Sequence, residues 1–118
     1  MFESQVCSSS GVWGADAVSG ETVYFPCAVG LTAVRVTGRS FHVLWASSGG
    51  GTGSPVVAGG RVFEQTTGGQ LQAFDPANGH VLQTVSLSSP VTHFPWLLPV
   101  GTTLYAASGT NIVAFSGV

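Results

Sequence analysis

The chain has 118 residues, of which 44% are hydrophobic and only 7% are charged, and its formal net charge is −2 at pH 7. This charge offers no basic stripe for a nucleic acid backbone, and no apolar run approaches the roughly 20 residues that a membrane-spanning helix requires. The sequence also contains 17 glycines and 6 prolines and lacks a sustained helical periodicity. We therefore expect an all-β, turn-dense protein that binds no nucleic acid and does not span a membrane.

Cys7 and Cys27 are the only cysteines, and they lie on the approach to the first predicted strand and at its end. We expect a disulfide between them, which would indicate an oxidising compartment; the alternative is two reduced, buried thiols. The start of the chain shows neither the charged nor the apolar region of a signal peptide. We therefore expect an extracytoplasmic protein, secreted or on the cell surface, if a signal was removed or truncated, and a cytoplasmic protein otherwise.

A unit of about forty residues recurs nearly three times along the chain. Each copy contains an apolar strand, a glycine turn and a second apolar strand, which is the signature of a β-hairpin. Leu31 and Leu71 lie 40 residues apart, and Leu71 and Ile112 lie 41 apart. Such a unit cannot bury its apolar face alone, so the copies are expected to stack on one another. The paired strands are predicted at 23–25 and 31–36, at 62–63 and 71–74, and at 104–106 and 112–115.

The second copy contains a turn whose residue types suit its geometry. Asp75 is placed to cap the turn, Pro76 supplies a φ of about −65°, and Asn78 and Gly79 tolerate positive φ. These four residues are therefore predicted to be structural. At the position of Asp75 the first copy has Arg35 and the third has Ser116, so those two turns must be stabilised differently.

Two runs of the second copy, Gly53-Ser-Pro-Val-Val57 and Ala73-Phe-Asp-Pro-Ala-Asn-Gly79, are followed by Val81-Leu82. They resemble the repeat of the pyrroloquinoline-quinone-like, or quinoprotein-type, β-propellers, above all of actinobacterial secreted or surface members. The resemblance extends over residues 11–118 and implies about three four-stranded antiparallel blades in a partial ring whose last blade is incomplete. Residues 1–118 would form one partial propeller unit, with blades at approximately 11–47, 51–87 and 92–118, and with 1–10 as a lead-in or a strand of a neighbouring blade.

In that family the tryptophan that ends each repeat docks into the neighbouring blade. Trp45 occupies this place in the first copy, whereas the second copy has Gln83. The resemblance therefore implies a structural role for Trp45 and the loss of the same contact after the second copy.

The family's quinone-dependent dehydrogenases bind calcium beside a catalytic aspartate and commonly carry two adjacent cysteines. Here the cysteines are not adjacent, and the five acidic residues are scattered along the chain, whereas calcium needs six to eight clustered oxygens. No Gly-x-Ser-x-Gly motif supports a nucleophilic serine. The five acidic residues are Glu3, Asp16, Glu21, Glu64 and Asp75. We predict no catalytic residue and no metal site on this chain, and neither quinone nor calcium nor another cofactor.

Propellers bind ligands on the loops at the faces of the ring, because packing between blades occupies the sheets. The corresponding segments are 47–54 and 88–96, and the second contains His93, Phe94 and Trp96 as possible binding-face residues. The alternative is that Trp96 has a packing role and that His93 is a loop residue whose side chain hydrogen-bonds to the backbone.

Charge is sparse, and no charged residue follows Asp75. Part of the surface is therefore expected to be covered by further blades of the same polypeptide, by protein partners or by copies of the chain, the alternative being a neutral monomer. The leading hypothesis is a non-catalytic propeller segment that acts as an extracytoplasmic scaffold or as a ligand- or protein-binding module. The alternatives are the C-terminal fragment of a propeller enzyme with its active site on other blades, and a three-blade protein that oligomerises to complete a ring.

Overall fold

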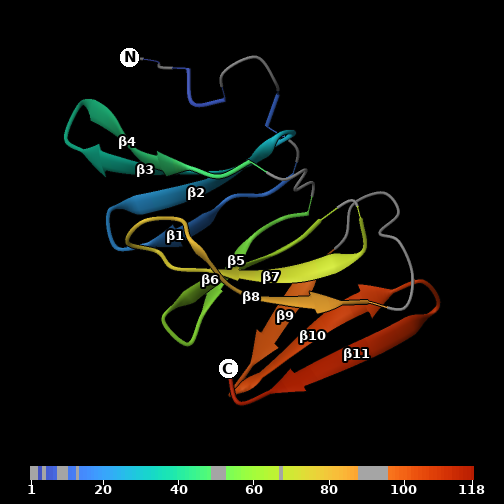
Figure 1. Cartoon of the computed structure of the whole chain (residues 1–118). Helices are drawn as coiled ribbons and strands as arrows, with labels where there is room; N and C mark the ends of the chain where they lie inside the picture. The colour runs from blue at the N-terminus through green and yellow to red at the C-terminus, as the bar shows by residue number, and fades with distance from the viewer. Residues whose placement is uncertain are drawn as a thin grey trace.

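The computed structural model describes residues 3, 5–7, 11–12, 14–48, 53–66, 68–87 and 96–118. These residues form eleven strands in three antiparallel sheets, and no helix occurs among them (Figure 1). The prediction of an all-β protein is confirmed. Each predicted strand pair becomes two adjacent strands of one sheet. In the first two sheets an additional strand lies on either side of the pair, and in the third sheet one lies on one side only within the described residues.

The first sheet contains four strands in sequential order. Tyr24 pairs with Ala33, and Ala33 pairs with Trp45 on the next strand, where a bulge follows between Ala33 and Val34. The alternation along these strands places Tyr24 and Ala33 on one face and Val34 on the other. The strands are β1 (Ala17–Ser19), β2 (Thr22–Cys27), β3 (Gly30–Thr37) and β4 (Ser40–Ala46).

The second sheet repeats this register. Phe63 pairs with Ala73, Ala73 pairs with Gln83, and a bulge again follows the alanine. Gln83 is therefore the structural counterpart of Trp45, and Phe63 that of Tyr24. The strands are β5 (Val56–Ala58), β6 (Arg61–Gln65), β7 (Gln70–Phe74) and β8 (Val81–Ser86).

The third sheet has three strands in the described residues. Tyr105 pairs with Ala114 and Leu104 with Phe115, so that these residues continue the series begun by the first two sheets. The strands are β9 (Leu97–Val100), β10 (Thr103–Ser108) and β11 (Asn111–Ser116), and β10 lies between the other two.

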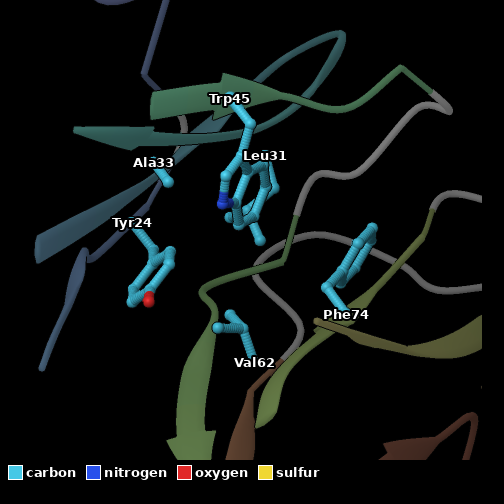
Figure 2. Packing of buried hydrophobic residues seen from close by; sticks show 6 residues of the cluster. All are labelled: Tyr24, Leu31, Ala33, Trp45, Val62 and Phe74. Atoms are coloured by element: carbon cyan, nitrogen blue, oxygen red, sulfur yellow. The ribbon is translucent and has the colours of Figure 1, made fainter. Parts of the chain in front are cut away.

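The three sheets stack face to face, and β5 contacts both β1 and β9 (Figure 1). Two apolar clusters fill the two interfaces. Tyr24, Leu31, Ala33 and Trp45 of the first sheet pack against Val62 and Phe74 of the second (Figure 2). The other face of the second sheet packs against the third through Phe63, Leu71, Ala73, Leu97, Leu104 and Ala106. The second sheet thus presents one face to the first sheet and the opposite face to the third.

The segment before β1 is joined to the first sheet by the predicted disulfide, which is present between Cys7 and Cys27. Both cysteines are buried. Val12 forms an isolated bridge with Cys27, and the amide of Ala28 donates to the carbonyl of Gly11. By the alternation along β2, the side chain of Cys27 lies on the face opposite to that of Tyr24, which faces the second sheet.

Candidate functional site

Trp45 closes the outer part of the first interface. Its indole N–H donates to the carbonyl of Pro76 over 2.8 Å, and its ring stacks on Phe74 at a centroid distance of 6.4 Å and an interplanar angle of 18°. The ring also lies 5.9 Å from that of Tyr24. A side chain of the first sheet is thereby anchored to the backbone of the second, and aromatic contacts of this kind add to the free energy of area burial.

The turn that receives Trp45 is stabilised by its own side chains. The Asp75 carboxylate accepts from the amide of Ala77 at 2.9 Å, and the Asn78 side chain accepts from the amide of His80 at 2.9 Å. Gly79 has a φ of 75°, and a Cβ at this position would overlap the six-membered ring of Trp45. Asp75, Asn78 and Gly79 thus shape the surface against which the indole packs.

The corresponding place in the second interface is open. A pocket of about 410 Å³ lies there between the second and third sheets, and we refer to it as the inter-sheet pocket. Its walls are formed by β6, β7, β8 and β11 and by the residues after β11, including Phe63, Leu71, Ala73, Gln83, Phe115 and Gly117.

These walls correspond to the residues around Trp45. Phe63, Leu71 and Ala73 are the counterparts of Tyr24, Leu31 and Ala33, and Phe115 is the counterpart of Phe74. Gln83 lies at the position of the indole. The pocket therefore occupies the space that a tryptophan fills one interface earlier, and Arg61 is the charged residue that lines it.

The burial of two polar side chains on β6 was not anticipated from the sequence. Glu64 and Gln65 are almost fully buried, with exposed fractions of 1% and 0%, and one side-chain oxygen of each has no hydrogen-bond partner. The Gln65 amide donates to the carbonyl of Ala107 in the third sheet over 2.9 Å. Burial raises the pKa of Glu64 to about 8, because desolvation penalises the carboxylate. The carboxyl group is therefore mostly protonated at pH 7.

The outer face of the third sheet carries large apolar side chains in contact with solvent. Leu98 is 50% exposed, Val100 55% and Ile112 68%. Leu98 pairs with Tyr105, and Ile112 with Ala107. These residues define what we refer to as the open face of the third sheet.

The possible binding-face residues are only partly placed by the structure. His93 and Phe94 lie outside the described residues. Trp96 precedes β9 and is 45% exposed. Among the described residues no group of three or more His, Cys, Asp or Glu side chains is arranged to hold a metal ion, and no helix in this part of the chain is long and apolar enough to cross a membrane.

Comparison with known proteins gives a consistent picture of the fold. No protein-family model matches the chain, and no curated protein matches it by sequence. Among solved structures, BamB from Moraxella catarrhalis is 17% identical with a TM-score of 0.74 over 92% of this chain. A europium-containing methanol dehydrogenase is 19% identical with a TM-score of 0.65 over 93%. Glutaminyl cyclase from Myxococcus xanthus is 17% identical with a TM-score of 0.59 over 86%.

The fold is that of β-propeller blades. The prediction of about three antiparallel blades in a partial ring is confirmed, because the three sheets do not close on themselves within the described residues and the last has three strands. The chain spans 35% of the length of BamB, 25% of the methanol dehydrogenase and 46% of the glutaminyl cyclase. All three identities are below 20%, so the similarity assigns a fold and leaves the function to the features of this chain.

Proposed function

We propose that this chain is a non-catalytic segment of an extracytoplasmic β-propeller and acts there as a scaffold or binding module. The observation that carries the proposal is the open face of the third sheet. In the first two sheets the corresponding face is covered by the next sheet: Leu31 of the first sheet is buried against the second, and Leu71 of the second sheet is buried against the third. Ile112 is their counterpart in the third sheet and is 68% exposed.

The chemistry of the open face favours another sheet as its cover. It consists of aliphatic and small side chains, and no residue after Asp75 carries a formal side-chain charge. Contiguous exposed apolar surface of this kind marks an interaction site. A further antiparallel sheet that presents residues like Val62 or Leu104 would pack there as the second sheet packs on the first and the third on the second. This sheet would come from the same polypeptide or from a partner chain.

The disulfide supports the extracytoplasmic part of the proposal. Cystines persist in oxidising compartments and are rare in the reducing cytosol. Cys7 and Cys27 are joined in the structure, and both are buried. Thiol alkylation of cells that are lysed directly into denaturant without a reductant would leave both cysteines unmodified if the disulfide forms where the protein resides. Quantitative alkylation of both cysteines under these conditions would contradict an extracytoplasmic location.

Site-specific photo-crosslinking in the cells that make the protein tests the open face. A benzophenone amino acid at Leu98 lies on the open face, whereas one at Leu82, on β8, provides a control with the same residue type and the same 50% exposure. We expect Leu98 to yield a defined adduct with a β-sheet segment and Leu82 to yield much less. Equal, diffuse labelling from both positions would contradict the proposal. Mass spectrometry of the adduct also identifies the covering sheet, and a catalytic constellation on that sheet would favour the enzyme-fragment alternative.

A further inference from the structure

We propose that Asn78, in the turn that receives Trp45, is a site of spontaneous deamidation, and that docking of Trp45 keeps the reaction slow in the folded protein. This modification site lies between β7 and β8, away from the open face of the third sheet, so it is independent of the proposed function. Asn78 is exposed and is followed by Gly79. The other asparagine of the chain, Asn111, is followed by Ile112.

The reaction joins the side chain of Asn78 to the backbone of Gly79. The backbone nitrogen of Gly79 loses its proton and attacks Cγ of Asn78, and the side-chain amide leaves as ammonia. Water then opens the resulting cyclic imide and gives either aspartate or isoaspartate, in which the chain continues through the former side-chain carboxyl. The step consumes only water. Glycine in the second position favours the attack, because it has no Cβ to crowd the reacting groups.

The folded turn opposes this reaction at both reacting groups. The Gly79 N–H donates to the carbonyl of Asp75 over 2.8 Å, and the Asn78 side-chain oxygen accepts from the amide of His80 at 2.9 Å. Before the attack, the nitrogen has to give up its proton and its hydrogen bond, and the side chain has to rotate out of its own hydrogen bond. Each lost bond adds to the barrier, so the reaction is slow for as long as the turn stays closed.

Trp45 keeps the turn closed. Its indole N–H donates to the Pro76 carbonyl, and Gly79 lies so close to its six-membered ring that an added Cβ would overlap it. Figure 2 shows the indole pointing from β4 toward the second sheet, and its ring stacks on that of Phe74. A rearrangement of residues 75–80 therefore has to break contacts with a buried and anchored indole. Opening of the turn and undocking of Trp45 form one local unfolding step.

The two products differ in their effect on the turn. An aspartate at position 78 keeps an oxygen at the place where the amide oxygen accepts from His80, and it adds a negative charge to a chain of formal net charge −2. Isoaspartate instead inserts an extra carbon atom into the backbone directly before Gly79, which has no free space toward Trp45. We therefore expect the isoaspartyl product to displace the turn from the indole and the aspartyl product to leave it docked.

Peptide mapping by mass spectrometry, after incubation of the wild-type protein at mildly alkaline pH, tests the site. One sample is kept in native buffer and the other in guanidinium chloride, where the turn is open. We expect Asn78 to convert at least about tenfold faster in the denaturant, because local opening limits the reaction in the folded protein. Asn111 is the internal control and is expected to convert far more slowly than Asn78 in the denaturant, since the β-branched Ile112 follows it. No conversion of Asn78 in the denaturant, or equal rates in the two samples, would overturn the proposal.

Two variants separate the docking of Trp45 from general stability. Trp45→Ala removes the indole from the turn and is expected to raise the rate at Asn78 in native buffer at least about tenfold. Leu104→Ala is the matched control, because it removes a fully buried side chain from the second interface, and it is expected to keep the rate within about twofold of the wild type. Equal acceleration by both variants would show that the rate follows global unfolding and would refute the role of Trp45.

A milder variant and the isolated product keep the test decisive if an alanine variant does not fold. Trp45→Phe retains an aromatic ring but has no N–H for the Pro76 carbonyl, and it is expected to raise the rate at Asn78 about twofold to tenfold. An unchanged rate in this variant would count against the proposal. The purified isoaspartyl form is expected to unfold at a lower urea concentration than Asn78→Asp, whereas equal midpoints would refute the predicted displacement of the turn.

Discussion

Substitution of Gly79 by alanine combines two costs that this chain allows to be separated. Gly79 has a φ of 75°, a conformation that L-residues rarely adopt, and its added Cβ would overlap the ring of Trp45. Gly60 has a φ of 73°, and a Cβ there would meet no atom within 4 Å. Gly60→Ala thus measures the backbone cost alone, and Gly79→Ala measures the backbone cost together with the overlap.

The two magnitudes follow from the geometry. A left-handed conformation costs an L-residue about 1–2 kcal/mol, so we expect this loss of unfolding free energy for Gly60→Ala. Overpacking adds about 1–3 kcal/mol, because Trp45 is held by its bond to the Pro76 carbonyl and by stacking on Phe74 and has little freedom to move away. Gly79→Ala should therefore cost about 2–5 kcal/mol.

Urea unfolding followed by circular dichroism, combined with a double-mutant cycle, measures the difference. Trp45→Ala alone is expected to cost about 3–5 kcal/mol. In that background the overlap is gone, so Gly79→Ala should cost no more than Gly60→Ala, which corresponds to a coupling energy of about 1–3 kcal/mol. Equal costs of the two glycine substitutions in the wild-type background would refute the reasoning.

Two further predictions concern the disulfide and Glu64. Replacing Cys7 and Cys27 by serine should lower the unfolding free energy by about 3 kcal/mol, because the bridge spans a sequence separation of 20; an unchanged urea midpoint would contradict this. The pKa of Glu64 is raised from 4.5 to about 8, so the unfolded carboxyl ionises first as pH rises. The contribution of Glu64 to stability is therefore greatest below about pH 4.5 and falls by about 4–5 kcal/mol as pH approaches 8. Glu64→Gln should abolish this fall in unfolding free energy, as measured by urea titrations at several pH values. Parallel pH profiles of the wild type and Glu64→Gln would exclude Glu64 as its cause.

The strands were predictable because the repeat reports the same structural position three times. Leu31 and Leu71 are both buried in their interfaces, and each follows a glycine-containing turn at the start of its strand. The significance of Gln83 was visible in part, since its place in the repeat marked a missing tryptophan. Whether the neighbouring side chains would collapse into that space depends on packing between sheets, which no local pattern encodes.

Glu64 and Gln65 were not predictable as buried residues. A glutamate at a strand position is ordinarily exposed, and the counterparts in the other copies are apolar, Phe25 and Pro26 in the first and Ala106 and Ala107 in the third. The repeat did contain a signal, because a polar pair at positions that are apolar elsewhere in the series marks a departure from the common packing. Reading that departure as burial requires knowing that both faces of the second sheet are covered.

The differences between the two interfaces are concentrated in space as well as in sequence. On the strands around the indole position the walls are preserved, with phenylalanine, leucine and alanine at the corresponding places. The differences fall on the side chain at the centre of the space, where Gln83 takes the place of Trp45, and on the rim, where Arg61 takes the place of Thr22. An empty apolar cavity would be costly to stability, but a pocket with a guanidinium and an amide at its edge is open to water and escapes most of that cost. The second interface therefore relies on its inner residues, such as Leu104 and Ala106, which are fully buried.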